Sequence, residues 1–364
     1  MQESQTAINN ATDASSDGGK TLRVGVAGAG VMGCNHARVI AGIPGVELVG
    51  IADPNPSRRA FAQQVLGCET FADVGTLLKR GIAAMFIATP TETHLDVAIT
   101  CIEEGLHVLI EKPIASSVEE AHKIISAARK ANVTLMVGHI ERFNPAMEAL
   151  KNAVFSDQIL SIAITRVGPI PPRAPRVGIV VDLAVHDIDL VLWLTQSRIV
   201  EIQSQLCSAI SQNEDLALLQ FRTASGVLAH INTNWVTPFK ARTVTVATRE
   251  KFLVADLLSR QTTEYFGFHP DGSYSMRHLS VSHTEPLRAE IRAFTDAIVR
   301  SERPPVSGED GLASLEVAMR CLEGRDRVER GSVLAPDPRL PSSSNRLRMD
   351  EVELQRAFVK RLEE

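Results

Sequence analysis

The first part of the chain alternates short apolar runs with longer stretches in which apolar residues recur at helical spacing. Runs such as LRVGVAG, VELVGIAD, AAMFIATP, LHVLIEKP and VTLMVGHI have no polar face, which is typical of parallel strands covered on both sides. The stretches between them, such as SVEEAHKIISAARKAN, predict the helices that such strands need as crossover connections. The pattern therefore predicts an α/β Rossmann domain, a doubly wound parallel sheet, over residues 22–145.

The pattern changes after residue 145. Segments such as QILSIAITRVG, DLALLQFRT, GVLAHINTNWV and ARTVTVATRE follow one another with few helices between them, and several alternate apolar and polar residues. Alternation of this kind indicates an antiparallel sheet with one covered face. Helical patterns remain near residues 180–196, 286–302 and 308–324. We therefore expect a second α+β domain with a large, mostly antiparallel, open-faced sheet over residues 146–328.

The two ends of the chain differ from the rest. Residues 1–21 are mainly Ser, Asn, Asp, Thr, Gly and Ala, so we expect a disordered tail that has little to bury. Residues 329–364 begin as a Pro/Ser linker and end in a helical pattern that places Leu354, Phe358 and Leu362 on one face. Neither end predicts a third domain.

Composition and charge exclude several classes of protein. The 364 residues carry 38 basic and 43 acidic side chains, a net charge of −5, and 4% are aromatic. A nucleic-acid binder would need a basic face or stacking aromatics. No apolar run approaches the roughly 18 residues of a membrane span, and the start is unlike a signal peptide, so we expect no membrane association and a cytoplasmic location. The five cysteines have no metal-motif spacing, and we expect no metal.

The strongest local motif is a glycine fingerprint directly after the first predicted strand and at the start of a helix. In this context Gly28 permits a tight turn, Gly30 leaves room for a diphosphate, and Gly33 allows the helix to pack closely on the strand. The amides at the helix N-terminus would bind the diphosphate. The predicted phosphate-binding loop consists of Gly28, Ala29, Gly30, Val31, Met32 and Gly33.

Asp53 ends the next predicted strand, about 20 residues after the glycines, where a carboxylate binds the adenosine ribose of a dinucleotide and repels a 2′-phosphate. NAD is therefore expected rather than NADP. Two alternatives stay open: Arg58, close by in the sequence, could accept a phosphate, and a Rossmann-like domain can bind no dinucleotide at all.

Two other segments carry candidate catalytic residues. Lys112 follows the strand LHVLI, at the strand end where open α/β sheets bind ligands, and its ammonium could polarise a substrate oxygen. Asp182 and His186 are four residues apart, so on a helix they share one face, and the carboxylate would raise the basicity of the imidazole. The alternatives are a surface lysine and a partly buried structural histidine. A metal site at the Asp/His cluster lacks a second group with ligand spacing.

Taken in order, GAGVMG, IATPTETH, EKP and DLAVH resemble the Gfo/Idh/MocA oxidoreductase family over residues 22–325. The resemblance implies a Rossmann domain with NAD as cofactor and a sheet domain that often forms an oligomer interface, so a homo-oligomer, dimer or tetramer, is expected. It assigns catalysis to Lys112, Asp182 and His186. The further cofactor contacts that it implies, besides Lys112, are Thr89, Pro90, His94 and Glu111.

Three further segments, GHIERFNP, RVGPIPPR and VVDLAVHDIDLVLWL, resemble the branch of this family that acts on UDP-linked N-acetylated sugars. That resemblance implies oxidation of the C3 hydroxyl of UDP-N-acetylglucosamine, with an aminotransferase using the 3-keto product for the 3-amino sugar of lipid A. Alternatives are an inositol- or glucose-type dehydrogenase and a non-catalytic NAD-binding sensor. Because a UDP-sugar is anionic, the candidate substrate-binding residues are polar or basic: Arg142, Asn144, Arg166, Arg173, Lys240 and Arg242.

Overall fold

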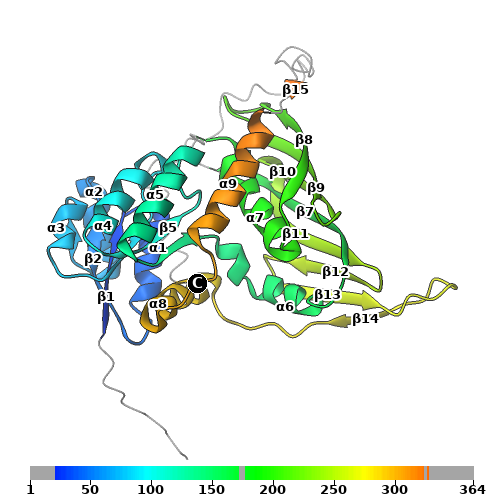
Figure 1. Cartoon of the computed structure of the whole chain (residues 1–364), viewed down its shortest axis with the longest axis horizontal. Coiled ribbons are helices and arrows are strands. Elements are labelled where there is room, and N and C mark those ends of the chain that lie inside the picture. Colours follow the sequence, from blue (N-terminus) through cyan, green and yellow to red (C-terminus); the bar gives the residue numbers. More distant parts are fainter. Residues whose placement is uncertain (1–20, 172–176, 324–325, 328–364) are drawn as a thin grey trace, which may run out of the picture.

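The computed structural model describes residues 21–171, 177–323 and 326–327. Two sheets lie side by side, with helix α9 between them (Figure 1). The first sheet is parallel and the second is mostly antiparallel, so the predicted fold class is confirmed. The predicted N-terminal tail up to residue 20, the predicted linker and helix over residues 329–364, and Arg173 lie outside the described residues.

The first sheet has the strand order β3-β2-β1-β4-β5-β6. Strands β4 and β6 are buried at every position, as expected for strands without a polar face, because helices cover both sides. The six strands are β1 (Leu22–Ala27), β2 (Val46–Ala52), β3 (Thr70–Phe71), β4 (Ala84–Ile87), β5 (His107–Glu111) and β6 (Leu135–Gly138). The helices are α1 (Val31–Ile40), α2 (Pro56–Leu66), α3 (Val74–Leu78), α4 (His94–Glu103) and α5 (Val118–Ala131), with a short turn η1 (Thr91–Thr93).

The second sheet has the order β14-β13-β12-β11-β7-β10-β9-β8-β15. Its central pair, β7 and β10, is parallel, as is the short pair β8 and β15. Neither β13 nor β14 was predicted, because their sequences are short and rich in polar residues. The strands are β7 (Ile159–Pro169), β8 (Ile199–Cys207), β9 (Leu216–Thr223), β10 (Leu228–Asn234), β11 (Val236–Thr248), β12 (Lys251–Asp256), β13 (Gln261–Phe266), β14 (Ser275–His278) and β15 (Asp326–Arg327).

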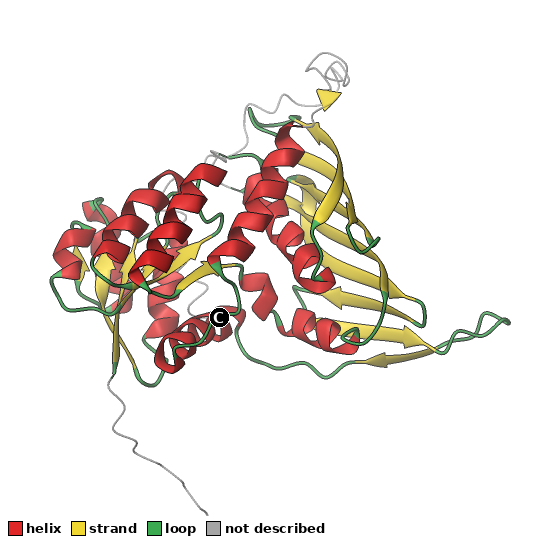
Figure 2. Ribbon diagram, in the orientation of Figure 1, coloured by secondary structure: helices red, strands yellow, loops and turns green. Residues whose placement is uncertain are grey.

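Helices cover one face of the second sheet and leave the other open (Figure 2). Strands β9 and β10 accordingly alternate buried and exposed residues, which is the predicted open-faced arrangement. The remaining helical elements are η2 (Ile140–Phe143), α6 (Pro145–Ala153), the π-helical turn η3 (Val180–Ala184), α7 (Val185–Thr195), α8 (Pro286–Arg300) and α9 (Gly308–Glu323). None of the helices in the described ranges is both long and apolar enough to cross a bilayer.

Each sheet has its own apolar core, and the last two helices join them. Although α8 follows the second sheet in the chain, its Phe294 is buried in the first core, edge-on to Phe86 with 5.3 Å between the ring centroids. Helix α9 enters both cores: Leu315 packs in the first and Ala318 in the second. The chain therefore returns to its first sheet before it ends. The domain limits 22–145 and 146–328 stay a prediction from the sequence.

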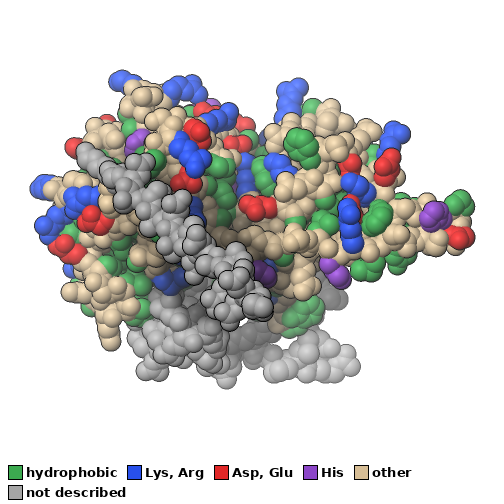
Figure 3. Space-filling model, turned by 90° about the horizontal axis from the view of Figure 1, so that it is seen from below, with side chains coloured by type: hydrophobic (Ala, Val, Ile, Leu, Met, Phe, Trp, Pro, Cys, Tyr) green, Lys and Arg blue, Asp and Glu red, His purple; other side chains and the backbone are tan. Residues whose placement is uncertain are grey.

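Strands β13 and β14 form an arm that projects from the second sheet. The space-filling view from below shows this arm protruding, with hydrophobic and histidine side chains near its tip (Figure 3). Phe268, Tyr274 and Met276 are at least half exposed there. The arm therefore contributes little to the core of the chain itself.

Candidate active site

The predicted cofactor residues gather at one edge of the first sheet. The glycine loop follows β1, Thr89 follows β4, and Lys112 follows β5. Because β1, β4 and β5 are parallel neighbours, their carboxyl ends meet at the same edge, where ligands bind in open α/β sheets.

The three glycines of the fingerprint are needed for three different reasons. Gly28 has φ +97°, and a side chain there would lie 2.6 Å from the carbonyl oxygen of Ala88. A Cβ atom on Gly33 would overlap the carbonyl oxygen of Gly28, at 1.7 Å. A Cβ atom on Gly30, by contrast, would meet nothing within 4 Å, so this position opens onto free space.

Helix α1 begins without a side-chain cap. Gly30 is its N-cap residue, and its first turn carries no acidic residue, whereas Asn55, Asp73 and Ser117 cap α2, α3 and α5. The amides at the start of α1 are therefore available to an anion, and the helix dipole favours one. Together with the open space at Gly30, this geometry fits the diphosphate of a dinucleotide.

Asp53 is buried, with 4% of its surface exposed. One carboxylate oxygen accepts a hydrogen bond from the amide of Ala29 at 2.8 Å, and the other accepts one from the amide of Asn55, also at 2.8 Å. The carboxylate thus ties the end of β2 to the glycine loop. Its remaining lone pairs can accept hydrogen bonds from ribose hydroxyls.

His94 joins the loops that follow β4 and β5. Its Nε2 lies 3.0 Å from the carbonyl oxygen of Thr89, and its Nδ1 lies 3.0 Å from that of Pro113. Burial lowers the pKa of His94, and a neutral imidazole can donate to only one of the two oxygens. His94 is buried, with 1% of its surface exposed, and its two contacts fix the loop after β4 relative to the loop after β5.

Lys112 connects the two parts of the molecule at this edge. Its Nζ donates to the backbone oxygen of Asp182 at 2.5 Å and lies 3.3 Å from Oδ1 of the same residue. Lys112 comes from the first sheet and Asp182 from the π-helical turn η3 before α7. The two segments that carry the predicted catalytic residues are therefore in direct contact.

His186 lies in the first turn of α7 with 9% of its surface exposed. Burial, reinforced by the positive charges of Lys112 and Arg166, lowers the pKa of His186 well below its ordinary value of 6.5. Its buried Nδ1 has no hydrogen-bond partner among the described residues. The lowered pKa favours the neutral imidazole, which is the form that can accept a proton.

The role of Asp182 in orienting His186 stays a prediction from the sequence, and the spacing that suggested it does not apply directly to the structure. Four-residue spacing places two side chains on one face only where the helix has about 3.6 residues per turn, and residues 180–184 form a wider π-helical turn. The carboxylate of Asp182 lies beside Lys112, and the pKa of His186 is lowered by burial. The structure therefore brings the Asp182 carboxylate into contact with the lysine.

Arg142 and Arg166, both predicted to bind substrate, are engaged in internal ion pairs. Arg142 donates to both carboxylate oxygens of Asp189, at 2.8 and 2.6 Å. Arg166 donates to Asp187 at 2.9 Å and to Glu141 at 2.8 Å. Because these arginines are only 6% and 3% exposed, their charges are already balanced inside the protein.

Asn144 is also internal: it caps α6 through the amide of Ala146 and donates to the carbonyl oxygen of Leu257. Lys240 is exposed. The side chain of Arg242 is 37% exposed and lies 3.2 Å from Glu141. Of the substrate residues predicted from the sequence, Lys240 and Arg242 are the accessible ones in the part of the chain that the structure describes.

Sequence reasoning missed the acidic partners Glu141, Asp187 and Asp189, and it missed His139, whose ring lies 6.1 Å from that of His186. A signal was present, because Asp187 and Asp189 stand in an otherwise apolar helical run, DIDLVLWL. Charged residues in such a run are rarely buried unless they are paired.

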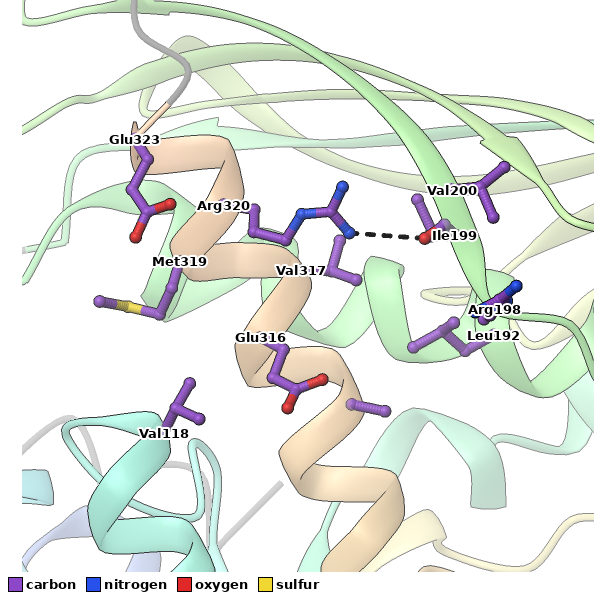
Figure 4. Close-up of a pocket in the computed structure, with 11 residues that line it drawn as sticks. Val118, Leu192, Arg198, Ile199, Val200, Glu316, Val317, Met319, Arg320 and Glu323 are labelled. Atoms are coloured by element: carbon purple, nitrogen blue, oxygen red, sulfur yellow. Dashed lines mark hydrogen bonds between the residues drawn. The ribbon is translucent and has the colours of Figure 1, made fainter.

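A groove of about 540 Å³ lies elsewhere, between the start of α5, helices α7 and α9, and β8. Figure 4 shows Arg320 donating across it to the carbonyl oxygen of Ile199. None of the predicted site residues lines it. We therefore place the active site at the strand edge.

The open space at Gly30 leads to a test. Gly30→Ala should fold normally, because the new methyl group meets no protein atom, yet it should raise the Kd for NAD about tenfold or more by filling the space of the diphosphate. Calorimetry measures the Kd, and thermal unfolding checks the fold. Gly75→Ala, in α3, is the control and should leave the Kd unchanged; equal affinity in both variants would contradict the assignment.

The internal role of Arg166 leads to a second test. Arg166→Met leaves Asp187 buried without its cation and Glu141 with Arg242 alone, so it should reduce the free energy of unfolding by about 3–5 kcal/mol. The control Arg222→Met breaks an exposed pair with Glu201 and should cost less than about 1 kcal/mol. Urea unfolding measures both. Unchanged stability together with a raised KM for substrate would instead make Arg166 a substrate residue.

Comparison with known proteins agrees with this geometry. Residues 22–139 match the model of an oxidoreductase family with an NAD-binding Rossmann fold, and residues 165–253 match the GFO/IDH/MocA C-terminal domain. UDP-N-acetylglucosamine 3-dehydrogenase from Acidithiobacillus ferrooxidans is 32% identical over 313 residues, covering 85% of this chain and 97% of that protein. Its solved structure covers 83% of this chain and 97% of its own, with a TM-score of 0.78 at 30% identity.

An inositol 2-dehydrogenase from Rubrobacter xylanophilus is 29% identical over 313 residues, covering 83% of this chain and 90% of that protein. Levoglucosan dehydrogenase, solved with NADH and levoglucosan, shares the fold with a TM-score of 0.75 at 21% identity, covering 83% of this chain and 96% of its own. The chain belongs to the Gfo/Idh/MocA oxidoreductase family and is an NAD-dependent oxidoreductase that acts on a CH–OH group.

Proposed function

We propose that this enzyme oxidises the C3 hydroxyl of UDP-N-acetylglucosamine with NAD⁺, and that an aminotransferase consumes the 3-keto product to make the 3-amino sugar of lipid A. The observation that carries the chemistry is the contact between Lys112 and Asp182, with His186 in the next turn. The 32% identity to the Acidithiobacillus ferrooxidans enzyme, over 97% of that protein, supports the substrate.

The chain's residues divide the work by charge. Bound NAD⁺ supplies the hydride acceptor. His186, neutral because of burial, accepts the proton of the sugar hydroxyl. The ammonium of Lys112 donates to the same oxygen and stabilises the negative charge that develops on it. Asp182 fixes that ammonium through its backbone oxygen at 2.5 Å.

In this proposal the first sheet binds the cofactor. The loop from Gly28 to Gly33 and the uncapped start of α1 hold the diphosphate, and Asp53 binds the adenosine ribose. Among the remaining cofactor residues, His94 acts by fixing the two loops that it joins. The remaining cofactor residues form the edge of the sheet that would bind the nicotinamide half of NAD. They are Thr89, Pro90, His94, Glu111 and Lys112.

The substrate's diphosphate requires cations that are not already neutralised inside the protein. Lys240 and Arg242 lie on β11, beside the end of β7, and both are accessible. We propose that they face the diphosphate together with Arg173, which lies outside the described residues.

Two alternatives remain. The inositol 2-dehydrogenase relative at 29% identity favours a free polyol as substrate. A non-catalytic NAD sensor would have no need for the contact between Lys112 and Asp182 beside a neutral His186.

The reaction is tested with UDP-N-acetylglucosamine that carries deuterium at C3 of the sugar. We expect deuterated NADH and a keto-sugar nucleotide by mass spectrometry, because the hydride leaves from that carbon. Undeuterated NADH would place the oxidation at another carbon. Turnover of myo-inositol or glucose without turnover of the nucleotide sugar would favour the polyol alternative, and NAD binding without any turnover would favour the sensor.

The same assay tests the residues. Lys112→Met and His186→Phe should each lower kcat by about 100-fold or more, the usual scale for an acid–base group, while the Kd for NAD changes little. The control is Lys79→Met, an exposed lysine after α3. Normal turnover by His186→Phe would remove the assignment of the base.

The open face of the second sheet supports a homo-oligomer, dimer or tetramer. Leu218 and Leu228, on the neighbouring strands β9 and β10, are 43% and 49% exposed there, and Phe252 on β12 is 40% exposed. Several exposed large apolar side chains on one face are typical of an interface. Light scattering should give the mass of a dimer or tetramer, and the double variant Leu218→Lys/Leu228→Lys should give a monomer. A monomeric parent protein would rule the proposal out.

A further inference from the structure

The mechanism leaves one buried acid unused. Glu290 lies on α8 with none of its surface exposed, and neither of its carboxylate oxygens has a hydrogen-bond partner among the described residues. A buried polar group without a partner is costly, and a buried charge costs far more. The position therefore calls for a physical explanation.

Glu290 faces the pair that supports the lysine. Ligand atoms of Glu290, Glu111 and His36 all lie within 4.8 Å of one another. Nε2 of His36, on α1, is 2.8 Å from Oε1 of Glu111, and Oε2 of Glu111 accepts a hydrogen bond from the amide of Lys112 at 3.3 Å. Helix α8 thus brings its acid against the residue that anchors the Lys112 backbone.

The two carboxyl groups differ in protonation. Burial, and then the negative charge of Glu111, raise the pKa of Glu290 well above its ordinary value of 4.5. Burial opposes ionisation of Glu111 as well, but the hydrogen bond and charge of His36 outweigh it and lower the pKa of Glu111. The two opposite shifts favour a pair of one carboxylic acid and one carboxylate, the arrangement that two close carboxyl groups adopt.

Charged groups on the neighbouring elements are occupied elsewhere. Besides His36 and Lys112, His94 also acts on Glu111. The other charged side chains on α1 and η2 have their own partners. These pairs are Arg38 with Glu285, Arg142 with Asp189, and Glu141 with Arg166.

We propose that Glu290 is a positioning residue: as a neutral acid it donates a hydrogen bond to the carboxylate of Glu111 and so holds the backbone of Lys112 at the catalytic edge. A rotation about the side-chain torsions of Glu290 brings the two groups from within 4.8 Å to hydrogen-bond distance. The proposal rests on the proposed role of Lys112. The competing occupant of the same three residues is a divalent metal ion.

The protonation is tested without catalysis. Infrared spectra at pH 7 should contain the carbonyl band of a protonated carboxylic acid, which Glu290→Gln should remove. Asp296→Asn, an exposed acid on the same helix, is the control and should keep the band. Absence of the band from the parent protein would overturn the proposal.

Stability against pH gives a second readout. A folded-state pKa above 4.5 means that the contribution of Glu290 to stability is full below about pH 4.5 and is lost as the pH rises toward the folded-state pKa. The melting temperature of Glu290→Gln should therefore gain on that of the parent protein as the pH rises. Asp296→Asn should show no such trend, and a constant difference for Glu290→Gln would contradict a raised pKa.

Activity separates positioning from simple packing. Glu290→Gln keeps a neutral donor and should retain kcat within about twofold, whereas Glu290→Leu loses the donor and should lower kcat about tenfold or more with an unchanged Kd for NAD, the scale of a hydrogen bond to a charged group. Full activity of Glu290→Leu would overturn the proposal. Activity of Lys112→Met would instead overturn the proposed function, so the two failures are distinguishable.

The metal alternative has its own outcome. Zn²⁺ added to the parent protein should leave the melting temperature unchanged if the site holds a proton. Stabilisation by Zn²⁺ that Glu290→Gln abolishes would replace the proposal with a metal site.

Discussion

The active site depends on the fixed relation between two separate cores. Helix α9 packs Leu315 into the first core and Ala318 into the second. Because one helix contacts both cores, it fixes the position of one sheet relative to the other. Helix α8 returns Phe294 to the first core. This packing places Nζ of Lys112, from the first sheet, 2.5 Å from the backbone oxygen of Asp182, beside the second sheet. The relation matters because misplacing a catalytic group by about 1 Å greatly lowers the rate.

The second constraint is that buried charged side chains near the site must be paired with opposite charges. Two arginines lie beneath the site with nearly all their surface buried, and each is balanced by acidic partners. The charge of one of them, Arg166, adds to burial and to the charge of Lys112 in lowering the pKa of His186. The positive charges that lower the pKa of His186 also favour the negative charge that develops on the substrate oxygen.

Local signals in the sequence were sufficient for five of the six strands of the first sheet, for the glycine loop and for the position of Lys112, because each depends on a few adjacent residues. The two-residue strand β3 was missed. Local signals were insufficient where the outcome depends on backbone geometry or on contacts between residues distant in the sequence. The spacing of Asp182 and His186 presupposed an ordinary helix, and the π-helical turn at 180–184 removed that premise. Arg142 and Arg166 were predicted to bind substrate, because sequence alone does not show which basic residues pair with Asp187 and Asp189, the two acids in the apolar run DIDLVLWL. Likewise, nothing in the sequence around Glu290 distinguishes it from the exposed acids, and its burial appears only when α8 packs in the fold.

The hydrogen bond from Ala29 to the carboxylate of Asp53 gives that side chain two duties at once. In the proposed cofactor site it binds the adenosine ribose, and through Ala29 it also fixes the glycine loop that would hold the diphosphate. Redesign toward NADP would normally begin by replacing this carboxylate. Here the replacement would also leave the buried amide of Ala29 without its hydrogen-bond acceptor and weaken the attachment of the glycine loop. A switch of cofactor would therefore have to supply a neutral hydrogen-bond acceptor at residue 53 along with a new cation.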